Sequence, residues 1–271
     1  MDRLRLLSYL SPSIPADLFA LVAETLQDRI GLPVALDFET RVSGPSPESD
    51  PFASGRADLA FACGPSYALL KAAGSAIALL PVAPVFEDAR AEGRPVYFAD
   101  VVVGIANSAR TFPDLAGSVW CYNDRYSRSG WQRMLERLGE IGHAAGPEEY
   151  FRRLIQSGSH LRSIELVADG TADAAAVDSN TLWLRRRADP GLAGGLRVIE
   201  SWGPMPIQPL LARAGLARDL REGICAALLG LHENEAARRR LEEFGVRRFA
   251  PVEERDYAGI RPVGVAAAGN S

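Results

Sequence analysis

Segments with the pattern of β-strands alternate with segments with the pattern of α-helices along this chain, and the alternation limits the possible folds more than any other feature. The first strand is expected at about 4–10 and the first helix at about 15–30, where Gly31 ends it. When helices regularly separate strands, the strands of a sheet run mostly parallel. The sequence therefore predicts an α/β fold with mainly parallel strands.

The same patterns place the remaining elements. We expect further strands at about 33–40, 57–63, 76–84, 95–106, 115–123, 172–177 and 196–202. We expect further helices around Leu69 and at about 129–139, 147–156, 161–169, 179–187, 215–231 and 233–244. The polar stretch from Ser43 to Pro51 is expected to be a loop, and the small residues from Val265 to Ser271 are expected to fray.

The composition is that of an ordinary folded protein. Hydrophobic residues make up 47% of the 271 residues and charged residues 24%, which suffices for one large domain or two lobes. The net charge of −4 offers no basic surface for nucleic acid or an anionic membrane. No apolar stretch approaches the roughly 20 residues of a membrane span, and the apolar run near the N-terminus is too short for a signal peptide. We expect either a cytoplasmic chain or one whose leader has been removed.

The three cysteines, Cys63, Cys121 and Cys225, lie far apart in apolar runs. Their spacing matches no metal-binding pattern, so we expect buried thiols. Neither a Walker A motif nor a Gly-x-Gly-x-x-Gly motif is present, and no His, Asp and Glu residues have metal-ligand spacing. The sequence therefore predicts no metal and no cofactor.

The segment Ser127-Arg128-Ser129-Gly130 stands directly before an expected helix. Hydroxyl groups and the free backbone N–H groups of a first helical turn point at one small volume, where the helix dipole favours negative charge. Gly130 would let a ligand approach the backbone closely. The segment is thus a candidate anion site. Its alternative interpretation is a simple helix cap, because Ser is a preferred capping residue everywhere.

A second segment, Ser157-Gly158-Ser159-His160, also stands at the start of an expected helix. Its imidazole could donate a hydrogen bond to an anion, and its hydroxyls could add further donors. Asp178 follows the expected strand at 172–177, at the edge where open α/β sheets bind ligands. It could orient His160 or contact a ligand, or it could merely cap the next helix.

Because Ser, His and Asp are all present, a hydrolytic triad is a further alternative. The chain has no Gly-x-Ser-x-Gly elbow, and its serines come in pairs at helix starts. That arrangement favours donation to an anion over nucleophilic attack. The residues alone therefore favour an oxyanion-binding site over a catalytic one.

Four motifs together resemble those of the PhnD-like substrate-binding proteins of phosphate, phosphite and phosphonate ABC transporters. They occur in the order of that family, and the resemblance covers roughly residues 4–260. The motifs are Gly55-Arg56-Ala57-Asp58 with Gly64-Pro65-Ser66-Tyr67, then Asn123-Asp124 with Ser127-Arg128-Ser129-Gly130, then Ser157-Gly158-Ser159-His160 with Asp173 to Ser179, and finally Gly203 to Pro209.

The resemblance implies the type II periplasmic-binding-protein fold, with two α/β lobes, two crossing strands and a ligand cleft between the lobes. It implies one lobe of residues 1–97 plus 206–271 and a second lobe of residues 98–205. It also implies roles for six residues. Ser127, Arg128 through its backbone, Ser129 and His160 would hold the oxyanion, Tyr67 would line the cleft from the first lobe, and Asp178 would lie beside the ligand.

The function that the resemblance implies is capture of a small phosphorus oxyanion by a monomer that works with an ABC permease in the periplasm. Members that bind aminoalkylphosphonates place acidic residues where this chain has Asn180 and Gln208. We therefore expect a ligand without a cationic tail. Two alternatives on the same fold are a cytoplasmic biosynthetic enzyme and a ligand sensor that signals by closing.

Overall fold

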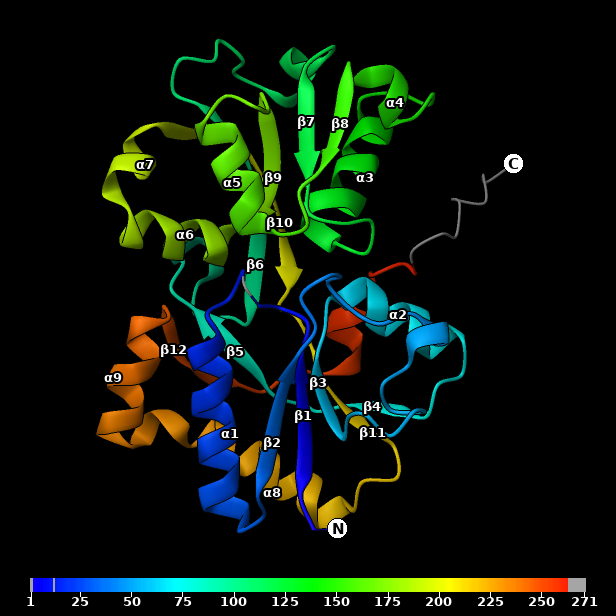
Figure 1. Cartoon of the computed structure of the whole chain (residues 1–271), viewed down its shortest axis with the longest axis vertical. Helices are drawn as coiled ribbons and strands as arrows, with labels where there is room; N and C mark the ends of the chain where they lie inside the picture. The colour runs from blue at the N-terminus through cyan, green and yellow to red at the C-terminus, as the bar shows by residue number, and fades with distance from the viewer. Residues whose placement is uncertain (1, 12, 263–271) are drawn as a thin grey trace. The chain divides into compact units, whose positions relative to one another are not determined.

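The structure is a computed structural model that describes residues 2–11 and 13–262 (Figure 1). Contacts divide the chain into two units. Unit 1 comprises the chain up to Val85 and from Pro206 onward, and unit 2 runs from Phe86 to Met205. The family resemblance implied a first boundary after residue 97. The contacts place it before Phe86, so that the residues leading into the long strand at Val96–Gly104 also lie in unit 2.

Unit 1 contains a mixed five-stranded sheet with the order β2-β1-β3-β11-β4. Its strands are β1 (Leu4–Ser8), β2 (Val34–Phe38), β3 (Leu59–Phe61), β4 (Ile77–Leu79) and β11 (Leu210–Arg213). β1 runs parallel to β2 and β3, whereas β11 runs antiparallel to β3 and β4. A two-stranded sheet pairs β5 (Ala83–Phe86) with β12 (Val246–Ala250). The helices are α1 (Ala16–Ile30), α2 (Gly64–Ala72), α8 (Arg218–Leu229) and α9 (Glu235–Glu243).

Helix α1 shows how the sequence dictates this local structure. Leu18, Val22 and Leu26 are buried on the face that packs against β2 and α8. The helix ends where Gly31 adopts φ 74° and donates its N–H to the Gln27 carbonyl at 2.9 Å. A left-handed residue of this kind closes many helices, and glycine adopts it without strain.

Unit 2 contains a second five-stranded sheet with the order β10-β6-β9-β7-β8. Its strands are β6 (Val96–Gly104), β7 (Val119–Tyr122), β8 (Arg153–Gln156), β9 (Ala174–Asp178) and β10 (Leu196–Pro206). β7 runs parallel to β8 and β9, and β6 runs antiparallel to β9. The helices are α3 (Arg133–Glu140), α4 (Pro147–Tyr150), α5 (His160–Ala168), α6 (Ser179–Ala188) and α7 (Pro190–Gly194).

The core of unit 2 forms where α5 packs on β9. Ala174, Ala175 and Ala176 are fully buried in that strand, and small side chains allow the helix to approach closely. The surrounding apolar residues are Val102, Val119, Cys121, Ile164, Val167, Val177 and Leu182. This packing fixes the strand that ends at Asp178 and the helix that begins at His160.

Several short elements complete the chain. One turn of π-helix covers Arg128–Gln132, and 3-10 turns cover Pro47–Ser49, Ala89–Ala91, Phe112–Leu115, Leu231–Glu233 and Glu254–Tyr257. Cys63 and Cys121 are buried as expected, whereas Cys225 is only half-buried, and all three are free thiols. Within residues 2–11 and 13–262, no helix is both long and apolar enough to cross a membrane.

The secondary structure differs from the expectations in two places. The helix expected at 147–156 ends at Tyr150, and Arg153–Gln156 forms β8, because Phe151 turns extended and the edge of β7 offers a hydrogen-bonding partner. β11 and β12 were missed, since each is short and pairs only with strands distant in sequence. The expectation of mainly parallel strands is confirmed in the first sheet, where only β11 runs against the other four strands. In the second sheet, β7, β8 and β9 run parallel and β6 runs antiparallel to them. The fraying expected for Val265 to Ser271 concerns residues outside the described part of the chain.

Candidate anion-binding site

The residues singled out from the sequence in unit 2 follow three neighbouring strands. β9, β7 and β8 lie side by side and run parallel, so their carboxyl ends lie at one edge of the sheet. The serine segment follows β7, His160 follows β8, and Asp178 is the last residue of β9. This edge is where open α/β sheets place ligands.

The turn that carries the two serines is tightly built. The Ser127 hydroxyl accepts a hydrogen bond from the Gly130 N–H at 3.0 Å and so caps the π-helical turn that leads into α3. A Cβ on Gly130 would clash with the side-chain oxygen of Asn123 and would lie 3.2 Å from both the Ser127 hydroxyl and the His160 ring. Only glycine therefore allows the turn to approach Asn123 and His160 so closely.

The segment before His160 serves mainly to hold that residue in place. The Ser159 hydroxyl accepts from the Arg162 N–H at 3.1 Å and caps α5, and the Ser157 hydroxyl donates to the Tyr122 carbonyl at 3.1 Å. Gly158, at φ 87°, donates its N–H to the Asn123 carbonyl at 2.9 Å. The Ser157 hydroxyl thus uses its proton within the chain, whereas the Ser159 hydroxyl accepts as a cap and keeps its proton, so its role as a ligand donor stays a prediction.

Four buried side chains meet at this edge of the sheet, and we call them the serine–histidine cluster: Ser127, Ser129, His160 and Asp178. The Nε2 atom of His160 lies 3.5 Å from the Ser127 hydroxyl, 3.2 Å from the Ser129 hydroxyl and 3.3 Å from Oδ1 of Asp178. The Ser129 hydroxyl donates to the same Asp178 oxygen. Each of the four residues is at most 5% exposed. The structure thus brings together four of the six predicted site residues.

This arrangement lacks the geometry of a Ser-His-Asp triad. A triad places the nucleophilic serine at one ring nitrogen and the carboxylate at the other, so that the carboxylate orients the ring and stabilises its charge. Here the serine hydroxyls and Asp178 Oδ1 all face Nε2 of His160. The cluster is therefore built as a convergent set of polar groups and lacks the serine–imidazole–carboxylate line that activates a nucleophile.

The other two predicted residues have different surroundings. The Arg128 guanidinium forms a two-pronged ion pair with Glu136, at 2.6 and 3.0 Å, so that side chain already has a carboxylate partner. Tyr67 belongs to unit 1, where its buried ring packs edge-on against Tyr257 with centroids 5.8 Å apart. Burial raises the pKa of the Tyr67 phenol. Its role beside a ligand stays a prediction of the family resemblance.

Two polar residues next to the cluster were not among the predicted site residues. Asn123 is 2% exposed, and its amide donates to the Asp124 carboxylate at 3.2 Å. Asn180 is 3% exposed, and its Nδ2 has no hydrogen-bond partner among the residues that the structure describes. Asn123 already belongs to the second sequence motif, and Asn180 was already named as the position without an acidic side chain, so the structure adds only their burial.

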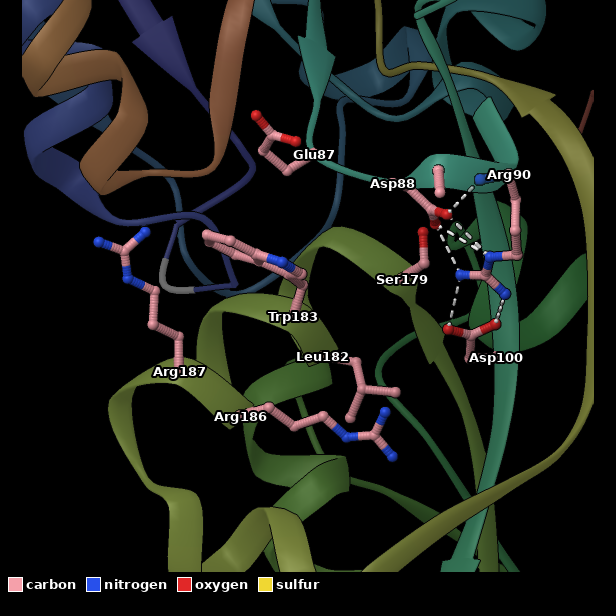
Figure 2. A pocket seen from close by; sticks show the side chains of 10 residues that line it. Glu87, Asp88, Arg90, Asp100, Ser179, Leu182, Trp183, Arg186 and Arg187 are labelled. Carbon is pink, nitrogen blue, oxygen red and sulfur yellow. Dashed lines mark hydrogen bonds and ion pairs between the residues drawn. The ribbon is translucent and has the colours of Figure 1, made fainter. Parts of the chain in front are cut away.

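A separate cavity of about 600 Å³ includes the first residue of α6, Ser179, in its lining (Figure 2). We call it the Arg90 pocket. Its lining residues are Glu87, Asp88, Ala89, Arg90, Asp100, Ser179, Leu182, Trp183, Arg186 and Arg187. Figure 2 shows the Arg90 guanidinium between two carboxylates, with bonds of 2.6 Å to Asp88 and 2.8 Å to Asp100. The hydrogen bonds that Arg90 donates to these carboxylates raise its pKa.

No group of three or more potential metal ligands occurs among the described residues. The Arg90 pocket was not predicted from the sequence, because its charged residues belong to no motif. Asp88 and Arg90 lie in a short turn, and β6 brings Asp100 to them. The pocket is thus a product of tertiary structure.

Comparison with known proteins agrees with this architecture. A family model described as ABC transporter, phosphonate, periplasmic substrate-binding protein matches residues 5–257. A binding component of a Pseudomonas aeruginosa ABC phosphonate transporter is similar at 15% identity and a TM-score of 0.75, covering 95% of this chain and 84% of that one. PhnD1 of Prochlorococcus marinus, solved with methylphosphonate, is similar at 15% identity and a TM-score of 0.75, covering 95% of each chain.

A Xanthomonas citri protein solved with ATP is similar at 17% identity and a TM-score of 0.69, covering 94% of this chain and 93% of that one. At these identities the solved structures establish the fold, which is that of type II periplasmic binding proteins. The family model extends over nearly the whole chain and includes every residue of the serine–histidine cluster. The chain therefore belongs to the family of periplasmic substrate-binding proteins of phosphonate ABC transporters.

Proposed function

We propose that this protein captures a small phosphorus oxyanion, namely a phosphonate, phosphite or phosphate, and that the serine–histidine cluster holds its oxygens. One observation carries the proposal. Two serine hydroxyls from the turn after β7 lie within 3.5 Å of a single imidazole nitrogen from the start of α5, and both serines are 1% exposed. Several hydrogen-bonding groups buried at one point suit a compact tetrahedral anion.

The surrounding backbone supports this assignment. Gly130 leaves the turn without a side chain, and the N-terminal end of a helix attracts anions through its N–H groups and its dipole. The dipole contributes about 0.3–1 kcal/mol for an exposed anion and up to ~2 kcal/mol for a partly buried one. Most of the affinity would therefore come from hydrogen bonds to the ligand oxygens, each worth roughly 1.5–3 kcal/mol when one partner is charged.

The substituent on phosphorus is expected to be uncharged or absent. A cationic amine would need a carboxylate partner, and Asn180, the buried residue near the cluster on α6, carries an amide instead. We therefore propose methylphosphonate, phosphite or phosphate as the preferred class, ahead of 2-aminoethylphosphonate. The proposed partner is an ABC permease, the proposed compartment is the periplasm, and the proposed state is a monomer.

Isothermal titration calorimetry tests the proposal with methylphosphonate, phosphite, phosphate, 2-aminoethylphosphonate, sulfate and ATP. We expect at least one of the first three to bind most tightly. Ser127→Ala should weaken that ligand about 10- to 100-fold, which corresponds to the loss of roughly 1.4–2.8 kcal/mol.

Ser118→Ala is the matched control. Ser118 also lies in unit 2 and has a buried hydroxyl, but that hydroxyl has no hydrogen-bond partner among the described residues. Its replacement should leave the affinity unchanged. Absence of binding by every phosphorus anion, or equal affinity of the Ser127→Ala and wild-type proteins, would contradict the proposal, and tightest binding of ATP would replace it.

A further inference from the structure

We infer that Asp178 makes the serine–histidine cluster selective for an oxyanion that carries its own proton, as in P–OH, and against a sulfonate of the same shape and charge. This inference rests on the proposed function, because it concerns the same site. It adds the protonation state of the ligand and identifies Asp178 as the residue that recognises it.

The position of Asp178 carries the argument. Its carboxylate is 5% exposed, accepts a hydrogen bond from the Ser129 hydroxyl and lies 3.3 Å from Nε2 of His160. These are the same groups that would face an anion. The cluster thus contains a fixed negative group at its centre, although its other members suit a negatively charged ligand.

A carboxylate can only accept hydrogen bonds. An unprotonated oxygen of a ligand placed against Asp178 would bring two acceptors and two negative charges together, with no proton between them. A ligand oxygen that carries a proton would instead donate to the carboxylate and form a short charge-assisted hydrogen bond. Asp178 therefore stabilises a bound P–OH group and repels an unprotonated ligand oxygen.

The remaining groups complete the pattern of recognition. Ser129 directs its proton to Asp178, and its hydroxyl can turn that proton to the ligand when a P–OH group donates to the carboxylate in its place. Ser127, Ser129 and His160 then serve the unprotonated oxygens of the ligand. One acceptor beside several donors matches a monoanion with one P–OH group, the form that phosphonates and phosphates populate below a second pKa of about 6 or somewhat higher.

Specificity of this kind works by penalising the wrong ligand. Methanesulfonate and the methylphosphonate monoanion have nearly the same shape and the same charge, but only the phosphonate carries a proton. Sites built to bond a ligand O–H group reject analogues that lack it by large factors, because a buried group of the protein then stays unpaired. A difference in affinity between these two anions would therefore report on the ligand proton.

The test compares the affinities of these two anions by calorimetry at about pH 6, where methylphosphonate is mainly a monoanion. We expect the wild-type protein to bind methylphosphonate at least about 100-fold more tightly. In Asp178→Asn, the side-chain oxygen still accepts from Ser129, and the new NH₂ group can donate to a bare oxygen. The preference should then shrink to about 10-fold or less, through weaker phosphonate binding and stronger sulfonate binding.

Asp100→Asn is the matched control, because it removes a buried carboxylate of unit 2 that lies in the Arg90 pocket. It should retain the wild-type preference. If Asp178→Asn does not fold, Asp178→Ser serves as the second variant, and a preference that stays at the wild-type value in a folded variant overturns the inference.

The outcomes separate the inference from the proposed function. Equal affinity of the wild-type protein for both anions overturns the role of the proton, while capture of phosphonate still stands. Absence of binding by either anion and by phosphate overturns the proposed function itself. A preference that disappears only in the Asp178 variant supports both.

Discussion

The serine–histidine cluster and the Arg90 pocket both lie in unit 2, but they differ in the charge of the side chains that form them. In the Arg90 pocket, one guanidinium is bonded to two carboxylates, Asp88 and Asp100, and its charge is more than balanced before any ligand arrives. In the serine–histidine cluster, the groups that converge are mostly neutral, and the only carboxylate is engaged by Ser129. The Arg90 pocket therefore contains the greater density of charge, since Glu87, Arg186 and Arg187 also line it.

The two regions adjoin along the chain at the start of α6. Asp178, the last residue of β9, belongs to the cluster, whereas Ser179, the next residue, lines the Arg90 pocket and accepts a hydrogen bond from the Phe98 N–H at 3.2 Å. Adjacent residues thus belong to the serine–histidine cluster, which is proposed to bind the ligand, and to the Arg90 pocket, where Arg90 forms ion pairs with Asp88 and Asp100. Substitutions on either side should affect different properties, namely affinity in the cluster and stability in the pocket.

The largest expected effect on the cluster comes from Gly130→Ala. The added Cβ would collide with the Asn123 side chain and press on Ser127 and His160, so the turn would have to move. We expect calorimetry to show more than about 100-fold weaker binding of methylphosphonate, because small displacements disrupt several hydrogen bonds at once. Gly139→Ala is the control.

Gly139 lies in α3, and a Cβ there would meet no atom within 4 Å. Its replacement by alanine should stabilise the helix by about 0.5–1 kcal/mol and leave the affinity unchanged. A Gly130→Ala protein that binds normally would show that the close approach of the turn is unimportant for the ligand.

His160→Gln is expected to have the next largest effect. A glutamine amide can reach the position of Nε2, but its flexible chain does not fix a donor there as the rigid ring does, where Ser127, Ser129 and Asp178 converge. We expect the affinity for methylphosphonate to fall about 10- to 100-fold with little change in melting temperature. His143→Gln is the matched control, since that ring bonds the Gly146 carbonyl at 3.1 Å and should leave the affinity as it is. Equal effects of the two substitutions would mean that His160 has no special role.

Arg90→Gln should lower the stability of the protein and leave its affinity for methylphosphonate unchanged, the reverse of the effect of His160→Gln. It leaves Asp88 and Asp100 close together without a cation. Removing one partner of a fully buried pair costs about 3–5 kcal/mol, but the Arg90 side chain is 42% exposed, so we expect about 1–2 kcal/mol in urea unfolding at pH 7. A loss of methylphosphonate affinity beyond about threefold would show that the two regions are coupled.

The pH dependence of this effect follows from Asp88. Burial by itself would raise the pKa of Asp88, but hydrogen bonds from Arg90 outweigh burial, and the pKa lies below its ordinary value. A depressed carboxyl pKa stabilises the folded state above the unfolded pKa of about 4, and the contribution disappears as the pH falls through the folded value. The difference between the wild-type and Arg90→Gln proteins should therefore shrink in acid, and a difference that is constant down to pH 2 would contradict this account.

Much of the fold and of the cluster could be predicted from local sequence. The length and end of α1 follow from its apolar face and from Gly31, which are signals within one element. Ser127, Ser129 and His160 could be found because helix starts with several hydroxyl groups are visible as short motifs, and the order of the motifs matched a family. What the motif could not reveal is that Ser157 and Ser159 bond the chain itself, because cap and ligand site share one sequence pattern.

The parts that could not be predicted depend on contacts across long stretches of sequence. β8 was expected to be a helix because Pro147 and the acidic residues after it are typical of a helix start, and only the edge of β7 favours the extended form beyond Tyr150. The Arg90 pocket depends on β6, which carries Asp100, and on β10, which brings Ser201 within 2.9 Å of Arg90. No local pattern encodes such a network, since each member is by itself an ordinary charged or polar residue in the sequence.

The smallest expected effect belongs to Arg128, the predicted site residue whose charge is paired outside the cluster. Its guanidinium bonds Glu136, whose side chain is 40% exposed, and ion pairs at such sites contribute about 0–1 kcal/mol. Arg128→Gln should therefore lower stability by less than about 1 kcal/mol and change methylphosphonate affinity by less than threefold at about 0.15 M salt. Arg133→Gln, which removes neighbouring ion pairs to Glu136 and Glu140, should behave alike. A tenfold loss of affinity in the Arg128 variant alone would place that side chain in the site and would mean that the cluster relies on a formal positive charge, as the Arg90 pocket does.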